Sequence, residues 1–318
     1  MLPWLTGGIF LGWALGSNDA ANVFGTAVST QTLRFRTAAI ILCIFLLAGA
    51  MLGGQAGMHT LSGLRANTLS SAFVITFSAA LTVTIMSIVK IPVSASQAVI
   101  GSIIGSGFAC CGETNLKPLL KVFICWAGTP LGAMLLSVIL YKTLGYFWQK
   151  VFKNIIIAGR TIQIGLILTG VYGSYALGAN NSANVTGVFL GLDTGFFIIT
   201  PFVACLIGGL SIALGVITFG KRVMSTIGRD LVPLEPFTAL IAVLSQAVTV
   251  HFYALLGVPV STSQAVIGAV LGIGILKGMR SINTGVLLHI VIGWVSTPVL
   301  SGIFAFFITK MMRIFWHL

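Results

Sequence analysis

The residues best suited to binding chemistry lie in a ten-residue motif that the chain contains twice. Residues 16–25 are GSNDAANVFG and residues 178–187 are GANNSANVTG, and each follows an apolar run. Of the five acidic residues, Asp19 alone falls inside an apolar segment, where a carboxylate costs about 2.5–3.5 kcal/mol. This position predicts a functional carboxylate that binds a coupling cation. The simpler alternative is a carboxylate that only neighbouring polar groups satisfy.

Asparagines surround Asp19 and its counterpart in the second motif. An amide can offer its oxygen to a hard cation or its NH₂ group to an anion. We expect Asn181 to join Asp19 at the cation. The asparagines expected to contact an anion are Asn18, Asn22, Asn180 and Asn184. Glycine and asparagine disfavour a helix interior, so we also predict that each motif interrupts its helix beside a binding site.

A second repeated motif brings hydroxyl and amide groups together. Residues 91–101 are IPVSASQAVIG and residues 258–268 are VPVSTSQAVIG. Proline is favoured at a helix start, and the exposed N–H groups of a first turn attract anions. The residues expected to contact the anion are Ser94, Ser96, Gln97, Ser261, Thr262, Ser263 and Gln264. Helix capping and bonding between helices are the alternative roles.

A third pair of segments indicates that the whole chain is duplicated. Residues 126–130 are WAGTP and residues 294–298 are WVSTP. The three pairs occur in the same order, at offsets of 162, 167 and 168 residues. The sequence therefore predicts two repeats, residues 1–150 and residues 151–318.

Composition indicates a polytopic helical membrane protein. Hydrophobic residues make up 57% of the chain and charged residues 7%, and several uncharged windows reach the length that crosses a bilayer. We expect an all-α fold of about ten segments, five in each repeat. They are Leu2–Val28, Thr37–Ala56, Leu69–Val89, Pro92–Cys110, Leu119–Tyr141, Thr161–Leu190, Gly195–Phe219, Phe237–Gly257, Pro259–Leu276 and Gly285–Thr309.

An odd number of segments in each repeat predicts that the second repeat is inverted in the membrane. The connections at residues 90–92 and 257–259 are so short that they predict tight helical hairpins, which either span the membrane or re-enter it. With both termini outside the plasma membrane, twelve basic residues fall on the cytoplasmic side and five on the outer side, as the positive-inside rule requires.

Several classes of function are disfavoured. The net charge of +12 comes from basic residues scattered through short loops, so we expect no nucleic-acid partner. The five cysteines lie without ligand spacing, and no nucleophile–base pair or nucleotide motif predicts an enzyme or a cofactor. Inverted repeats with polar breaks are typical of secondary transporters. An uncoupled anion channel and a membrane scaffold are the competing classes.

These motifs together resemble the inorganic phosphate transporter (Pit) family, which includes prokaryotic phosphate and sulfate permeases. The resemblance rests on the two ten-residue motifs at 16–25 and 178–187, which we call the GxN motifs, on the two PVSxSQ motifs, and on residues 218–230, TFGKRVMSTIGRD. It covers nearly the whole chain. It implies phosphate uptake coupled to Na⁺ or H⁺, an inverted-repeat fold and a homodimer. The implied site is formed by the asparagines, Asp19 and the two serine-rich clusters.

Two departures from the family pattern keep sulfate open as the alternative substrate. The family has aspartate in both copies of the first motif, whereas this chain has Asn181 in the second. The PVS motif often ends in histidine, whereas this chain has Gln97 and Gln264. Phosphate at neutral pH still carries a proton and gains from an acceptor such as Asp19, while sulfate only accepts hydrogen bonds. Asp19 therefore favours phosphate.

Overall fold

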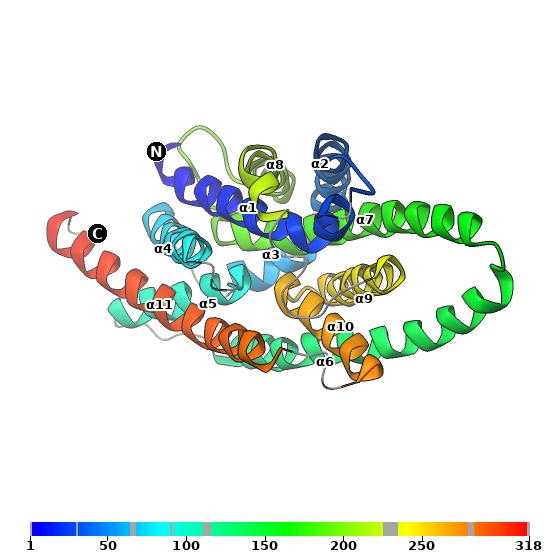
Figure 1. The fold of residues 1–318 in the computed structure, drawn as a ribbon. Coiled ribbons are helices and arrows are strands. Elements are labelled where there is room, and N and C mark those ends of the chain that lie inside the picture. Colours follow the sequence, from blue (N-terminus) through cyan, green and yellow to red (C-terminus); the bar gives the residue numbers. More distant parts are fainter. Residues whose placement is uncertain are drawn as a thin grey trace.

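The computed structural model describes residues 2–29, 31–63, 68–89, 91, 93–110, 116–224, 235–278 and 283–316, and these residues form an all-helical bundle (Figure 1). The α-helices are α1 (Thr6–Ser29), α2 (Phe35–Gly53), α3 (Gln55–Ser62), α4 (Leu69–Ile88), α5 (Ala95–Ala109), α6 (Leu116–Val151), α7 (Ile155–Thr186), α8 (Pro201–Met224), α9 (Pro236–Leu255), α10 (Thr262–Lys277) and α11 (Thr284–Trp316). Two 3₁₀ helices, Leu2–Leu5 and Gly187–Phe189, flank α1 and α7.

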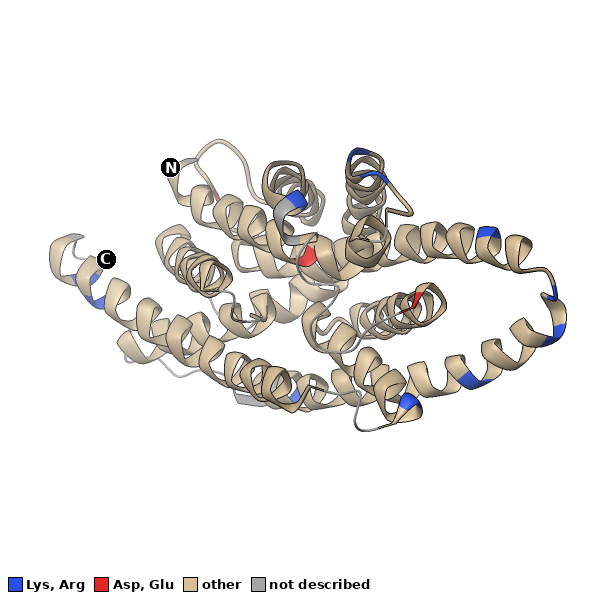
Figure 2. Cartoon of the chain, viewed as in Figure 1, with Lys and Arg blue, Asp and Glu red and all other residues tan. Residues whose placement is uncertain are grey.

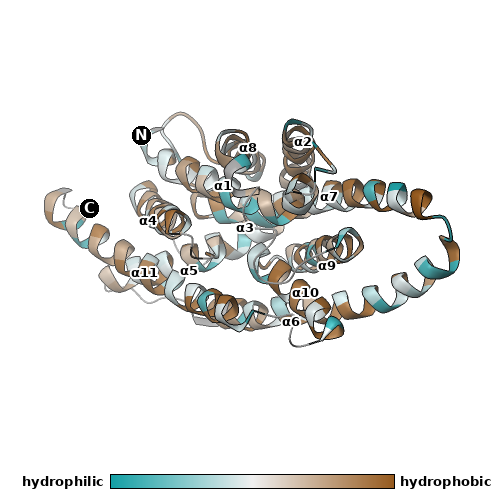
Figure 3. Ribbon diagram, viewed as in Figure 1, coloured by the Kyte–Doolittle hydropathy of each residue, from teal (hydrophilic) through white to brown (hydrophobic). Residues whose placement is uncertain are grey.

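The chain is a multi-pass membrane protein. Seven of the described helices, α2, α4, α6, α7, α8, α9 and α11, are long and apolar enough to cross a membrane. Helices α5 and α10 are apolar but shorter, and α1 carries the polar motif. Figure 3 shows hydrophilic colouring in the middle of the bundle, where α1 and α7 pass each other. The number of spans that cross the bilayer stays a prediction.

Helices of the two halves pack in matching pairs. Helix α1 packs against α8 as α7 packs against α2, and α5 packs against α11 as α10 packs against α6. We call α4 with α5 hairpin one, and α9 with α10 hairpin two. The pairing follows the order of the repeated motifs, while the boundary near residue 150 and the inversion of the second repeat stay predictions.

The predicted interruption of the two GxN motifs is wrong. Helix α1 continues through residues 16–25, and α7 continues to Thr186. Their glycines serve close helix packing instead. A Cβ atom on Gly16 would lie 1.9 Å from the Ile212 carbonyl oxygen of α8, and one on Gly178 would lie 1.9 Å from the Leu46 carbonyl oxygen of α2. Helix propensity alone takes no account of such contacts.

The helix boundaries lie instead at the tips of the two hairpins. Helices α5 and α10 begin at Ala95 and Thr262, so the prediction that proline opens each helix is also wrong. Ser94 and Ser261 are the N-caps, whose hydroxyls accept hydrogen bonds from the Gln97 and Gln264 amides at 3.4 and 3.2 Å. Lys90 and Pro92 of the first tip lie outside the described residues.

Other predicted bounds need smaller corrections. A single segment is predicted over Thr37–Ala56, whereas α2 ends at Gly53 and is followed by the short helix α3. Helix α8 begins at Pro201 rather than Gly195, because residues 190–200 form a turn in which Asp193 pairs with Ile198. Helices α6 and α7 are longer than predicted and meet at residues 152–154, at the right of Figure 1. Figure 2 shows basic residues along this extension.

Candidate functional site

Asp19 is the centre of a buried polar network inside the bundle. Its side chain is 4% exposed, and α1 contains no other acidic residue (Figure 2). The Oδ1 atom accepts hydrogen bonds from the Nδ2 atoms of Asn18 at 3.4 Å and Asn22 at 3.2 Å. The Oδ2 atom accepts from Asn181 Nδ2 at 3.2 Å and from Thr262 Oγ1 at 2.7 Å. All four donors are uncharged, so the carboxylate is oriented, but no described residue acts as a counter-ion to its charge.

The second GxN motif repeats half of this arrangement around Asn181. Its Oδ1 atom accepts hydrogen bonds from Asn180 Nδ2 at 3.0 Å and from Asn184 Nδ2 at 2.9 Å. Because Asn181 is the counterpart of Asp19, the bond between them joins equivalent positions of the two repeated motifs. Both motifs therefore contribute to one network.

The start of α10 brings hairpin two into the same network. Asn180 exchanges two hydrogen bonds with the backbone of Val260, through Nδ2 to the carbonyl oxygen at 2.8 Å and through Oδ1 from the amide at 2.9 Å. Asn22 Nδ2 donates to Ser263 Oγ at 3.3 Å. Together with Thr262, these contacts tie hairpin two to α1 and to α7.

Hairpin one contributes differently. Ser94 and Ser96 are buried and bond to each other through their Oγ atoms at 3.2 Å. In the described part of the chain, the hydrogen bonds of Ser94, Ser96 and Gln97 stay within hairpin one. Ala95 still packs against the apolar cluster formed by α1, α2, α7 and α8, so the start of α5 lies beside this cluster.

Several buried amide oxygens have no hydrogen-bond donor among the residues that the structure describes. They are Gln97 Oε1, Asn184 Oδ1, Gln246 Oε1 and Gln264 Oε1. Burying an amide oxygen without a partner is costly, and oxygen atoms of this type are the ligands that hard cations prefer. The Asp19 carboxylate and the Asn184 oxygen of the same network give the site the chemistry to accept a cation, while the hydroxyls and amide NH₂ groups can donate to an anion.

The structure brings most of the predicted residues together and leaves their binding roles as predictions. Asn18, Asp19, Asn22, Asn180, Asn181, Asn184, Thr262 and Ser263 form one bonded network. Ser94, Ser96, Gln97, Ser261 and Gln264 lie at the helix starts without bonding to it. Sequence reasoning missed the role of Val260, because its contacts are made by the backbone and do not depend on the type of side chain.

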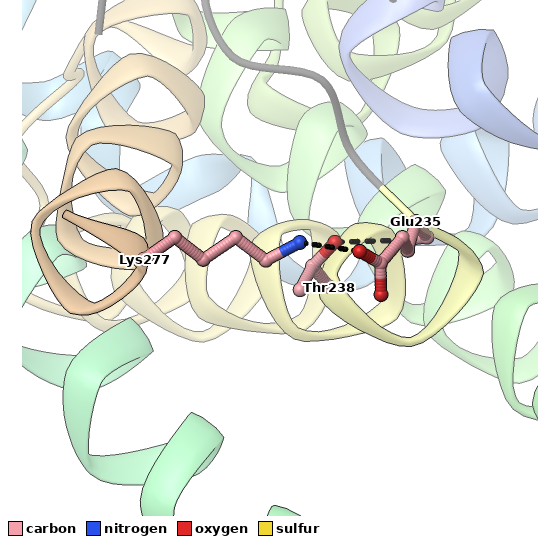
Figure 4. A network of polar contacts seen from close by, with 3 residues as sticks. All are labelled: Glu235, Thr238 and Lys277. Carbon is pink, nitrogen blue, oxygen red and sulfur yellow. Dashed lines mark hydrogen bonds and ion pairs between the residues drawn. The ribbon is translucent and has the colours of Figure 1, made fainter. Parts of the chain in front are cut away.

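The two other acidic residues of the described part, Glu235 and Asp193, make contacts outside the network. Glu235 Oε1 pairs with Lys277 Nζ at 2.9 Å at the open end of hairpin two (Figure 4). Asp193 Oδ1 accepts from the Gly195 amide at 2.8 Å. Glu113 and Asp230 lie outside the described residues, as do residues 225–230 of the segment TFGKRVMSTIGRD. Thr218 at the start of that segment accepts a hydrogen bond from Trp13 Nε1 at 2.9 Å.

Comparison with known proteins identifies the family. The sequence model described as "Phosphate transporter family" matches residues 15–159 and again residues 149–305. The chain belongs to the phosphate transporter family. This agrees with the predicted resemblance and with a protein that transports rather than catalyses. The family matches the chain twice, and the two matches meet near the predicted repeat boundary.

Individual relatives cover nearly the full length of the chain. A protein of Methanocaldococcus jannaschii named "Putative phosphate permease" is 28% identical, over 95% of each chain. A protein of Haemophilus influenzae with the same name is 26% identical, over 98% of this chain and 97% of that one. A solved structure, "The sodium-dependent phosphate transporter", superposes with a TM-score of 0.86 at 24% identity, over 98% of both chains, and so has the same fold.

Proposed function

We propose that this phosphate transporter family member imports inorganic phosphate across the plasma membrane by symport with Na⁺. One observation carries the proposal: the buried Asp19 carboxylate is shared by Asn22 of its own motif, Asn181 of the second motif and Thr262 of hairpin two. Because three elements bond to this carboxylate, a movement of any one of them changes the contacts of its charge. Cation binding at Asp19 would thereby be coupled to the arrangement of both motifs.

The choice of cation follows from the groups around Asp19. A carboxylate with nearby amide oxygens is a suitable ligand set for a hard cation. The amides of Asn181 and Asn22 can turn their oxygens toward a cation, because each amide offers either an oxygen or an NH₂ group. The solved structure with the same fold is named as sodium-dependent, which supports Na⁺. A proton carried by Asp19 is the alternative coupling ion.

The anion would be bound by donors that carry no net charge. Ser94, Ser96, Ser261 and Ser263 supply hydroxyls at the starts of α5 and α10, where exposed N–H groups favour an anion. The unpaired oxygens of Gln97 and Gln264 can accept the hydrogen bond that protonated phosphate donates and that sulfate lacks. This difference favours phosphate over sulfate, which remains the second candidate.

Coupling is required by the electrical cost of import. An inside-negative potential opposes an entering monovalent anion by about 2.3 kcal/mol per 100 mV, so an uncoupled pore would release phosphate. Co-transported cations offset this cost.

The proposed orientation, with both termini outside, is supported by the excess of basic residues in the predicted cytoplasmic loops. Impermeant labelling of single cysteines beside Arg34 and Lys310 checks it, since these positions should react from opposite sides.

Uptake by reconstituted proteoliposomes tests the proposal. We expect labelled phosphate to accumulate when a Na⁺ gradient is imposed and to accumulate little with a pH gradient alone. Arsenate should compete for the same site, and sulfate should compete much more weakly. Uptake that follows the membrane potential without any cation would indicate a channel. Saturable sulfate uptake that phosphate does not inhibit would make the chain a sulfate permease.

The Asp19→Asn variant tests the carboxylate itself. We expect Na⁺-driven uptake to fall about 100-fold, the loss that corresponds to roughly 3 kcal/mol of charge-assisted contacts. Asp193→Asn is the matched control, because Asn keeps the oxygen that accepts from the Gly195 amide in an exposed turn. Unchanged Na⁺ dependence in a folded Asp19→Asn protein would move the cation site elsewhere.

A further inference from the structure

The tip of hairpin two leaves two backbone carbonyls to be satisfied from outside the hairpin. Helix α9 ends in a Schellman motif: the Gly257 amide donates to the Ala254 carbonyl and the Val258 amide to the Tyr253 carbonyl, both at 3.0 Å. Gly257 has a φ of 69°, which favours glycine. The Leu256 and Gly257 carbonyls lie beyond these bonds, at the negative end of the helix dipole.

Side chains from two other elements donate to these carbonyls. Thr60 Oγ1 of α3 donates to the Gly257 carbonyl oxygen at 2.5 Å. Lys121 Nζ of α6 donates to the Leu256 carbonyl oxygen at 3.1 Å, where its charge also complements the end of α9. Helix α3 supports the tip by packing as well, since a Cβ atom on Gly257 would lie 2.9 Å from the Ala56 carbonyl oxygen.

The held tip is directly connected to the polar network. Val260 follows Gly257 by three residues and bonds to Asn180, and Thr262 follows by five and bonds to Asp19. An extended chain spans at most about 3.3–3.6 Å per residue, so three to five residues limit how far the tip can move while both bonds remain. Val258 and Val260 are fully buried. A displacement of the tip therefore has to disturb the contacts at Asn180 and Asp19.

We propose that Thr60 and Lys121 are positioning residues that form a latch on hairpin two. By holding the Gly257 and Leu256 carbonyls they keep Val260 on Asn180 and Thr262 on Asp19, and their release opens the network toward the face on which α3 lies. The inference rests on the proposed function only in treating this opening as a step of transport.

Among the described residues, the two contacts of the latch belong to hairpin two, although both hairpins share a sequence motif. The position that corresponds to Lys121 in the second half is His289, whose Nδ1 atom bonds to the Gly285 carbonyl oxygen of its own helix at 2.8 Å. Helix α2 ends at Gly53 to make room for α3, whereas α8 continues without a break to Met224. Lys121 and the short helix α3, which differ between the two halves, thus both contact the tip of hairpin two.

Thiol labelling at the tip measures the latch directly. The reporter is Val258→Cys, a buried position, in protein whose five native cysteines are replaced and which is held in lipid nanodiscs so that both faces meet a water-soluble maleimide. We expect Thr60→Val and Lys121→Met, which remove the donors, each to speed labelling roughly fivefold, the population shift that one net hydrogen bond supports. Thr60→Ser and Lys121→Arg keep a donor and should label at the original rate, as should His289→Gln.

Transport kinetics tell whether Thr60 and Lys121 position the polar network or only stabilise the fold. In the same latch variants we expect the apparent KM for Na⁺ to rise severalfold, with the conservative variants restoring it. Labelling needs no transport, so a chain that moves another ion would still report the latch. If Thr60→Val lowers the unfolding temperature, Lys121→Met decides alone, because that side chain is exposed. Folded Lys121→Met protein with an unchanged labelling rate would overturn the proposal.

Discussion

Hairpins one and two have nearly the same sequence at their tips but are bonded to different parts of the molecule. Each has a serine N-cap, and each packs a glycine against a proline-containing helix. A Cβ atom on Gly101 would lie 2.2 Å from the Pro298 carbonyl oxygen, and one on Gly268 would lie 2.1 Å from that of Pro130. Beyond this shared packing, hairpin two bonds inward to the polar network, while hairpin one bonds outward to α11.

The outward bonds of hairpin one form a row between α5 and α11. Ser102 Oγ lies 2.6 Å from Ser301 Oγ, Thr309 Oγ1 donates to Ser106 Oγ at 3.2 Å, and Arg313 Nη1 donates to the Ala109 carbonyl at 3.1 Å. The corresponding positions of α10 and α6 are Ala269, Ala133, Ile273, Tyr141, Leu276 and Gly145. Helix α5 is therefore fixed to α11 by polar bonds along its length, whereas α10 packs on α6 through apolar residues at the same positions, and α6 bonds to hairpin two at its tip, through Lys121.

This difference suggests an unequal division of movement. A two-state transporter needs one element whose contacts can change while another stays in place. Among the described residues, α10 packs on α6 through apolar side chains, and the hydrogen bonds of hairpin two to other elements are concentrated at its tip. We infer that hairpin two is the element whose position responds to the state of Asp19.

The largest effect that would sharpen this comparison is expected at Thr262 and its counterpart Ala95. Thr262→Ala removes a donor at 2.7 Å from a buried carboxylate, so the apparent Na⁺ affinity in uptake assays should fall about tenfold, as for the loss of a charge-assisted hydrogen bond. Thr262→Ser should retain it. Ala95→Thr adds a hydroxyl at the equivalent position of hairpin one and should change the affinity little. Equal effects at both positions would break the distinction between the hairpins.

The sequence predicted the parts of this picture that depend on residue type and spacing. A helical membrane fold, the pairing of the two motifs and a central Asp19 follow from apolar length, repetition and the cost of a buried charge. The same reasoning could not tell the two hairpins apart, because the residues that differ, Thr262 against Ala95, look like a conservative change. Which hairpin reaches Asp19 is decided by three-dimensional packing.

Two errors have a common physical origin. Gly16 and Gly178 were expected to break their helices because glycine has low helix propensity, but neighbouring backbones approach so closely there that only glycine fits. The latch was missed for a related reason. Thr60 and Lys121 bind backbone carbonyls of a distant segment, and carbonyls carry no sequence signature. Contacts that depend on the position of the backbone cannot be predicted from the residue types of a single sequence.

A smaller effect is expected where α5 bonds to α11. Ser102→Ala and Ser301→Ala each remove one side of a buried pair, and the pair should contribute about 0.6 kcal/mol, with about 1.7 kcal/mol as the upper limit for bonds between membrane helices. A double-mutant cycle on unfolding in detergent measures this coupling. Ala269→Gly is the control in hairpin two, where no coupling with Ala133 is expected. Absence of coupling between Ser102 and Ser301 would remove the fixed attachment of hairpin one.

The smallest effect is expected at the open end of hairpin two, where Glu235 and Lys277 form an ion pair at 2.9 Å (Figure 4). The corresponding residues of hairpin one, Thr68 and Cys110, cannot form such a pair. The Glu235 side chain is 75% exposed and that of Lys277 is 23% exposed, so water and salt screen the attraction. We therefore expect Glu235→Gln to lower the free energy of unfolding by less than about 0.5 kcal/mol and to leave the Na⁺ dependence of uptake unchanged. Unfolding of Glu235→Gln and the parent protein at low and high salt measures the difference, which should shrink as salt rises. A loss that is large and independent of salt would mean that the open end, rather than the tip, holds hairpin two in place.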